Sequence, residues 1–114
     1  MSYKLFLDDL RDAEAVYNNS YDKFIAVRNY DDFINCIKTR GIPLFISFDN
    51  DLGVDTNGNI LPDGYACAKW LVYESNLDLR DLQFRVHSAN PVARVQIQSL
   101  LDNYIKFLKN NQPG

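Results

Sequence analysis

Carboxylate side chains follow two apolar runs of this 114-residue chain, and its only histidine follows a third. Asp8 and Asp9 come directly after the first run, Asp49 and Asp51 follow the second, and His87 ends the third. Carboxylates gathered in one place repel one another unless a cation neutralises them or they share protons. Mg²⁺ prefers such oxygen ligands, and imidazole can carry a proton near neutral pH. If these residues meet, they can support metal-assisted proton-transfer chemistry.

The apolar runs predict the strands that would bring these residues together. Each run is short, is bounded by turn-forming residues and is separated from the next by a helical pattern, which is typical of a parallel sheet. We expect strands at residues 3–8, 23–28, 43–49 and 82–87. Ligands of open α/β sheets bind beyond the carboxyl ends of the strands. The polar residues are therefore expected to converge on one site.

Helical periodicity and capping residues predict the elements between the strands. Residues 18–20 (Asn-Asn-Ser) break a first, short helical pattern, and Gly41 is a stop signal for the second. Asp63 can cap the third helix, and Asn90 followed by Pro91 is a strong helix start. We expect these helices at residues 11–16, 31–39, 63–75 and 91–109.

The alternation of strands and helices predicts a single α/β domain over residues 1–114. Right-handed crossovers and a doubly wound layout give a parallel sheet with the strand order 2-1-3-4, truncated after its fourth strand. Helices on both faces would make this a three-layer α/β/α, flavodoxin-like fold. The strand at 82–87 alternates apolar and polar residues, which suits a sheet edge. An unpaired edge there could support a homodimer.

The acidic residues favour a site for Mg²⁺ or Mn²⁺ held by Asp8, Asp9 and Asp49. The alternative is that these aspartates only cap helices and turns. The segment 51–62 does not fit a calcium-binding loop, because no glycine stands at the sixth position from Asp49 or Asp55 and no glutamate closes the loop at the twelfth. We expect a solvated loop there that could act as a lid over the site.

Residues around the last helix start could bind a phosphate group. Its first backbone amides and its dipole attract phosphate oxygens, and Arg94 in its first turn could form a bidentate pair with them. Ser88 and Asn90 lie beside the lone His87, and Arg11 is a further candidate. Structural roles for the histidine and surface roles for the arginines are the alternatives.

Composition indicates an ordinary globular protein, with 46% hydrophobic and 24% charged residues. The net charge of −3 gives no reason to expect duplex nucleic acid or an anionic membrane as a partner. No apolar stretch approaches the roughly 18 residues of a membrane span, and the N-terminus lacks the layout of a signal peptide. Cys36 and Cys67 are expected to be buried, reduced thiols, which suits the cytoplasm.

Four segments together resemble the cyclic-phosphate-processing receiver-like domains, a divergent branch of the receiver fold of two-component response regulators. They are residues 5–11 (LFLDDLR), 46–53 (ISFDNDLG), 63–65 (DGY) and 86–91 (VHSANP). The resemblance implies that Asp8 and Asp9 bind Mg²⁺, that Asp49 corresponds to the phosphoryl-accepting carboxylate of receivers, and that Ser88 lies near their hydroxyl position. The chain departs from the pattern at Asn50, where the divergent branch commonly has histidine. It also lacks the fifth strand on which receivers carry a lysine.

Three functions remain open at this point. The first is a metal-dependent phosphoester hydrolase acting on a small cyclic phosphate or nucleotide. In it Asp51 orients a water, His87 is the general acid/base, and Ser88, Asn90 and Arg94 hold the phosphate oxygens. The second is phosphorylation of Asp49 in signalling. The third is a non-catalytic module that binds a nucleotide or a protein.

Overall fold

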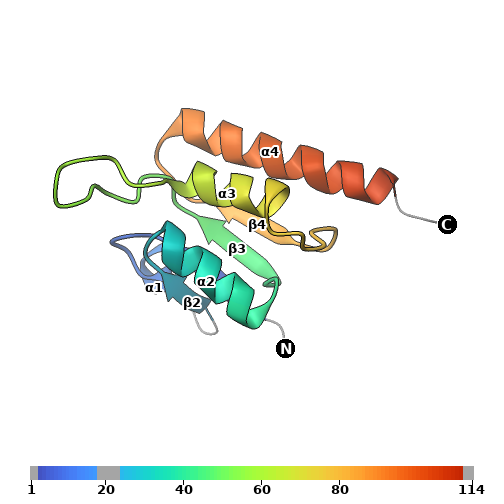
Figure 1. Cartoon of the computed structure of the whole chain (residues 1–114), viewed down its shortest axis with the longest axis horizontal. Coiled ribbons are helices and arrows are strands. Elements are labelled where there is room, and N and C mark those ends of the chain that lie inside the picture. The colour runs from blue at the N-terminus through green and yellow to red at the C-terminus, as the bar shows by residue number, and fades with distance from the viewer. Residues whose placement is uncertain (1–2, 18–23, 112–114) are drawn as a thin grey trace.

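Four short strands form one parallel sheet in the order β2-β1-β3-β4 (Figure 1). The structure is a computed structural model that describes residues 3–17 and 24–111. The strands are β1 (Lys4–Leu7), β2 (Phe24–Val27), β3 (Phe45–Phe48) and β4 (Gln83–Val86). The predicted strand order is confirmed, and β4 is an edge strand as expected. Pairing of two copies through this edge stays a prediction.

Helices follow the strands as expected, with ends that differ from the prediction by one or two residues. They are α1 (Ala13–Tyr17), α2 (Tyr30–Arg40), α3 (Gly64–Tyr73) and α4 (Pro91–Asn110). Asn29, Asp63 and Asn90 cap α2, α3 and α4, because each side chain accepts a hydrogen bond from a backbone N–H of the first turn. The predicted break at residues 18–20 lies outside the described residues. No helix in the described part of the chain is long and apolar enough to cross a membrane.

The two faces of the sheet are covered unequally. One face packs against α2, α3 and α4 through a core that includes Leu5, Leu7 and Ile46, all fully buried. On the other face Phe6 packs edge-on against Tyr17 of α1 and against Phe24. The fold therefore has the three layers that the sequence predicts, and α1 is the helix of the third layer within the described residues.

The backbone ladder places one polar residue from each of three strands side by side. Leu7 pairs with Phe48, and Phe48 pairs with Val86. The ladder continues one residue further, because the N–H of Asp49 donates to Leu7 O (2.9 Å) and that of His87 to Phe48 O (2.9 Å). Asp8, Asp49 and His87 thus form the next row across the sheet. Adjacent strands lie about 4.8 Å apart, so side chains in one row are neighbours.

Candidate active site

Asp8, Asp49 and His87 lie at the carboxyl ends of β1, β3 and β4. Each offers one atom that could ligate a metal ion, and these atoms lie within 4.8 Å of one another. All three side chains are largely enclosed: those of Asp8 and His87 are 1% and 4% exposed, and that of Asp49 is 13% exposed. The three side chains lie on the α1 face, since each stands two residues beyond a residue of that face and side chains alternate along a strand. The register of the sheet therefore brings together three of the residues whose convergence the sequence predicts.

The Asp8 carboxylate contacts four hydrogen-bond donor groups. Its Oδ1 accepts from the backbone N–H groups of Leu10 (2.9 Å) and Arg11 (2.8 Å), and its Oδ2 contacts Arg11 Nε (2.9 Å) and His87 Nε2 (3.0 Å). Burial alone would raise the pKa of Asp8, but the hydrogen bonds from Arg11, Leu10 and His87 and the charge of Arg11 outweigh it, and the pKa is lowered. Asp8 is therefore an ionised acceptor at neutral pH.

The His87 ring has a partner at each nitrogen. Nε2 contacts Asp8 Oδ2, and Nδ1 lies 2.7 Å from Ser47 Oγ, which lies 2.6 Å from the hydroxyl of Tyr17. The Phe6 ring stacks on the imidazole with 4.8 Å between centroids and 2° between planes. Burial lowers the pKa of His87, although the hydrogen bond and charge of Asp8 act against this.

Asp49 has fewer donors than Asp8. Its Oδ1 accepts from the backbone N–H of Asn50 (2.8 Å), and Arg11 Nη2 lies 4.0 Å away. Burial, together with the charges of Asp8 and Asp9, raises the pKa of Asp49 to about 6, against the opposing effects of the Asn50 hydrogen bond and the Arg11 charge. Asp49 is the carboxylate in this cluster whose ionised form is least well compensated.

The raised pKa of Asp49 predicts a pH-dependent effect of Asp49→Asn on stability. The raised pKa means that the native state binds the Asp49 proton more tightly than the unfolded chain does. The stability that protonated Asp49 contributes is therefore complete below its ordinary pKa of 3.8 and is lost as the pH rises through about 6. In metal-free buffer, Asp49→Asn should raise the free energy of unfolding by up to about 3 kcal/mol above pH 7 and change it little near pH 4. Urea denaturation at both pH values measures this, and an equal effect at both would contradict the assignment.

Arg11 and Asp9 lie beside the cluster without completing it. The Arg11 guanidinium reaches both carboxylates, at 2.9 Å from Asp8 and 4.0 Å from Asp49, and its side chain is 46% exposed. Asp9 points elsewhere, since its Oδ2 lies 3.5 Å from the position that a Cβ would take on Gly53. Asp9 lies in the bend that follows β1, and it is not among the residues whose ligand atoms lie within 4.8 Å of one another.

Three further candidate residues make local backbone contacts. Asp51 Oδ1 accepts from the N–H of Gly53 (3.1 Å), and Ser88 Oγ accepts from that of Asn90 (3.1 Å). Asn90 Oδ1 accepts from the first amides of α4, at Val92 (3.0 Å) and Ala93 (3.2 Å). The amides that we expected to hold a phosphate thus already have an acceptor. Substrate contacts of Ser88 and Asn90, and the water-orienting role of Asp51, stay predictions.

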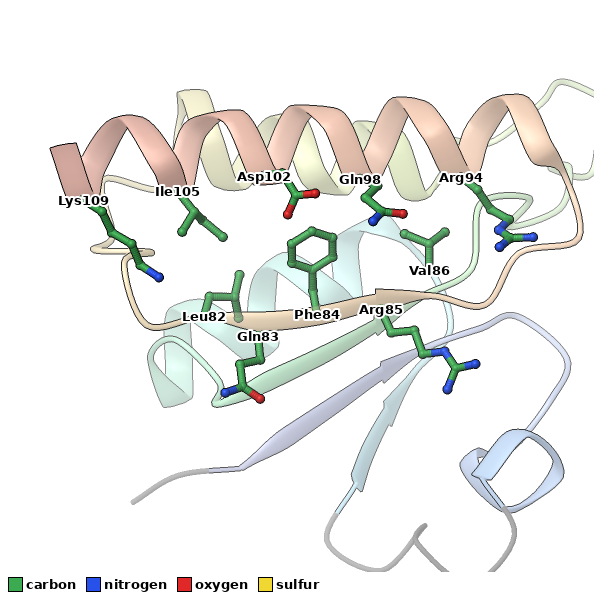
Figure 2. A pocket seen from close by; sticks show the side chains of 10 residues that line it. All are labelled: Leu82, Gln83, Phe84, Arg85, Val86, Arg94, Gln98, Asp102, Ile105 and Lys109. Carbon is green, nitrogen blue, oxygen red and sulfur yellow. The ribbon is translucent and has the colours of Figure 1, made fainter.

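Arg94 lies in a groove between α4 and β4, with a volume of about 490 Å³ (Figure 2). Phe84 and Val86 of β4 point toward α4, whereas Arg85 points away from it, and Arg94 extends from the first turn of α4 toward the end of β4 (Figure 2). Among the described residues, no ion pair or hydrogen bond joins Arg94 to the Asp8, Asp49 and His87 cluster. Its role in phosphate binding stays a prediction.

The loop between β3 and α3 folds on itself. Val54 and Ile60 form an antiparallel bridge, and Asp55 Oδ1 accepts from the N–H groups of Asn57 (2.8 Å) and Asn59 (2.9 Å). In Figure 1 the loop projects away from the body of the sheet. The Asp55 carboxylate is used inside the loop, and a role of this loop as a lid stays a prediction.

Two residues of the site were not anticipated. Ser47 is fully buried and lies between Tyr17 and His87. A polar residue inside the apolar run of β3, two positions before Asp49 and so on the same face, is a signal that sequence reasoning could have used. Tyr17 carries no comparable signal, because only the fold brings α1 next to β3.

The donor set fits an oxygen-preferring divalent cation. Asp8 and Asp49 offer carboxylate oxygens from neighbouring strands, and the raised pKa of Asp49 shows a charge that lacks compensation. A cation at Asp49 would supply that compensation. The Arg11 guanidinium lies next to both carboxylates, where the cation would bind, and its half-exposed side chain can move aside. The residues present therefore suit Mg²⁺ or Mn²⁺ at Asp8 and Asp49, with Asp9 close by.

Comparison with known proteins gives one match. A family model described as the cyclic-phosphate processing receiver domain matches residues 3–103, which is most of the chain and includes every residue of the site. Neither the search of curated proteins nor the search of solved structures gives a significant match.

Proposed function

The chain belongs to the family of cyclic-phosphate processing receiver domains, and on this premise we propose that it hydrolyses a small cyclic phosphate in a cation-dependent reaction. One observation carries the proposal: donor atoms of Asp8, Asp49 and His87, from three different strands, lie within 4.8 Å of one another. This arrangement combines two carboxylates that can hold a cation with an imidazole that can serve the reacting oxygens. A cyclic nucleotide is a substrate of the right chemical class.

The reaction adds one water to the phosphorus, breaks one phosphorus–oxygen ester bond and gives a phosphomonoester, with a proton passing from the water to the released alkoxide oxygen. Bound to Asp8 and Asp49, Mg²⁺ or Mn²⁺ would supply charge neutralisation and polarise the phosphate. Arg11 spans both carboxylates and can bind a non-bridging phosphate oxygen once its side chain turns outward. His87 Nε2 faces Asp8. The sequence-based expectation for His87 is a general acid/base that protonates the leaving oxygen.

The enclosure of His87 favours a second candidate, a non-catalytic binding module. Both ring nitrogens contact protein groups, and the side chain is 4% exposed. A histidine held in this way can support the carboxylates without reaching a substrate. In that case the site would bind a nucleotide or another phosphorylated ligand without converting it. Phosphorylation of Asp49 remains the third possibility from the sequence.

A panel of cyclic phosphates, including 2′,3′- and 3′,5′-cyclic nucleotides, tests the proposal in the presence of Mg²⁺ or Mn²⁺. We expect turnover that chelation abolishes and that His87→Ala lowers by about 10²–10⁴-fold. Asp49→Asn, which removes a proposed cation ligand, should also lower turnover. Asp78→Asn is its matched carboxylate control, because Asp78 is exposed and pairs with Arg80 before β4, at the opposite end of the sheet. It should leave turnover unchanged.

Binding measurements separate the alternatives. Saturating Mg²⁺ should stabilise the wild-type fold by about 2.7 kcal/mol at a hundred times its Kd, and Asp49→Asn should reduce this gain. Tight ligand binding without product would favour the binding module. A stable mass increase after treatment with a small phosphodonor, lost in Asp49→Asn, would favour phosphorylation. If neither turnover nor cation stabilisation is found, the hydrolase proposal is wrong.

A further inference from the structure

Two hydroxyl groups that the proposed reaction does not use form a chain of hydrogen bonds with His87. The Tyr17 hydroxyl is 2.6 Å from Ser47 Oγ, and Ser47 Oγ is 2.7 Å from His87 Nδ1. Ser47 is fully buried, and the His87 side chain is 4% exposed. On the other side of the ring, His87 Nε2 lies 3.0 Å from Asp8 Oδ2. This chain of hydrogen bonds therefore connects Tyr17 of α1 to the candidate active site.

The contacts of Asp8 fix the direction of these hydrogen bonds. Two backbone N–H groups and Arg11 Nε donate to the Asp8 carboxylate, which can only accept when ionised. His87 Nε2 must therefore donate to Oδ2. In a neutral imidazole the other nitrogen is then an acceptor, so Ser47 donates to Nδ1 and Tyr17 donates to Ser47.

With the opposite direction, the Tyr17 O–H would have no acceptor among the described residues. If Nδ1 carried a proton, Ser47 would have to accept it and donate to the Tyr17 oxygen, and the Tyr17 O–H would need another acceptor. Among the described residues, the only hydrogen bond found for the Tyr17 hydroxyl is the one to Ser47. The Phe6 ring, stacked on the imidazole at 4.8 Å and 2°, limits tilting of the ring. The surroundings are thus consistent with one tautomer and one ring orientation.

We propose that Ser47 and Tyr17 are positioning residues that hold the His87 ring with a proton on Nε2 and with Nδ1 as a hydrogen-bond acceptor. The single ring N–H of His87 then donates to Asp8 Oδ2, so His87 orients this carboxylate, where the sequence suggested a general acid/base. Resting on the proposed function, this assigns His87 to position Asp8, one of the two carboxylates that would hold the cation. Ser47 and Tyr17 act through His87 and do not contact the substrate.

Nitrogen-15 NMR of the metal-free protein tests the proposal without any substrate. The chain has one histidine, so its two ring-nitrogen resonances are identified without ambiguity. We expect wild type to show the proton on Nε2 and a bare, hydrogen-bonded Nδ1. Ser47→Ala should shift the Nδ1 resonance toward that of a free nitrogen. Tyr17→Phe keeps the ring that stacks on Phe24 and should shift Nδ1 in the same direction by less, because Ser47 loses the donor that polarises it.

Tyr73→Phe is the control, since Tyr73 is 69% exposed at the end of α3, and it should leave both resonances unchanged. A proton on Nδ1 in wild type, or an unchanged Nδ1 resonance in Tyr17→Phe, would overturn the proposal. The second variant keeps the test valid if Ser47→Ala does not fold. On a substrate that the protein turns over, Ser47→Ala should lower kcat by about 10–100-fold. Absence of turnover would count against the hydrolase function alone, because the NMR result does not depend on it.

Discussion

Replacing Asp8 by asparagine is expected to move the His87 proton from Nε2 to Nδ1 and to lower any turnover by about 10²–10⁴-fold. The backbone N–H groups of Leu10 and Arg11 donate to Oδ1, so the oxygen of the new amide should stay at that position. Its NH₂ group must then replace Oδ2, facing His87 Nε2. A donor group now faces Nε2, so Nε2 must become an acceptor. The ring proton is then expected on Nδ1, which donates to Ser47 Oγ.

The same NMR experiment measures this change, and the folded state is checked by circular dichroism. Asp9→Asn is the matched control: it makes the same substitution at the adjacent residue, which lies outside the cluster, and should leave the proton on Nε2. If the proton stayed on Nε2 in Asp8→Asn as well, Asp8 would not determine the tautomer. The loss of turnover has two sources, because the variant also removes a carboxylate from the cation site.

Gly64→Ala is expected to be strongly destabilising, because the new methyl group would overlap backbone atoms. A Cβ at Gly64 would lie 1.9 Å from the carbonyl oxygen of Asp49 and 3.0 Å from Cα of Asn50. Both are backbone atoms, so α3 would have to move away from the end of β3. The hydrogen bond from Gly64 N to Asn50 O (2.8 Å) would be disturbed with it. We expect the free energy of unfolding to fall by about 3 kcal/mol, which lowers Tm by roughly 10 °C.

Gly58→Ala separates this close approach from backbone strain. Gly58 has a φ of +82° and nothing within 4 Å of the Cβ position. Its substitution should cost only the strain of a left-handed residue, about 1 kcal/mol. Thermal unfolding of the two variants measures the difference. Equal losses in Tm would show that α3 can shift without cost, and the packing argument would then be wrong.

Much of the fold could be predicted from the sequence because the signals are local. The apolar runs of β1 and β3 required central strands, and the alternation in β4 required an edge, as the strand order β2-β1-β3-β4 confirms. Capping by Asp63 and Asn90 followed from residue type and position. Element ends differed by one or two residues because polar residues such as Asp8 and His87 stay in the backbone ladder while leaving the regular strand.

The candidate site could be predicted only in part. Asp8, Asp49 and His87 follow from the convergence of strand ends, whereas Asp9 lies outside their cluster, in the bend after β1, whose shape the sequence does not give. Asp51, Ser88 and Asn90 make local contacts with backbone N–H groups, and these residue types serve equally well as caps and as ligands. Sequence alone does not separate the two uses.

The row formed by Asp8, Asp49 and His87 has a consequence for how the site comes into being. Their side chains meet only when three strands, distant in sequence, have paired in register, and the N–H groups of Asp49 and His87 are themselves part of that pairing. A fragment that lacks one of these strands lacks one of the three side chains, and opening of the edge strand β4 would separate His87 from the two aspartates. The complete site therefore requires all three strands to be paired.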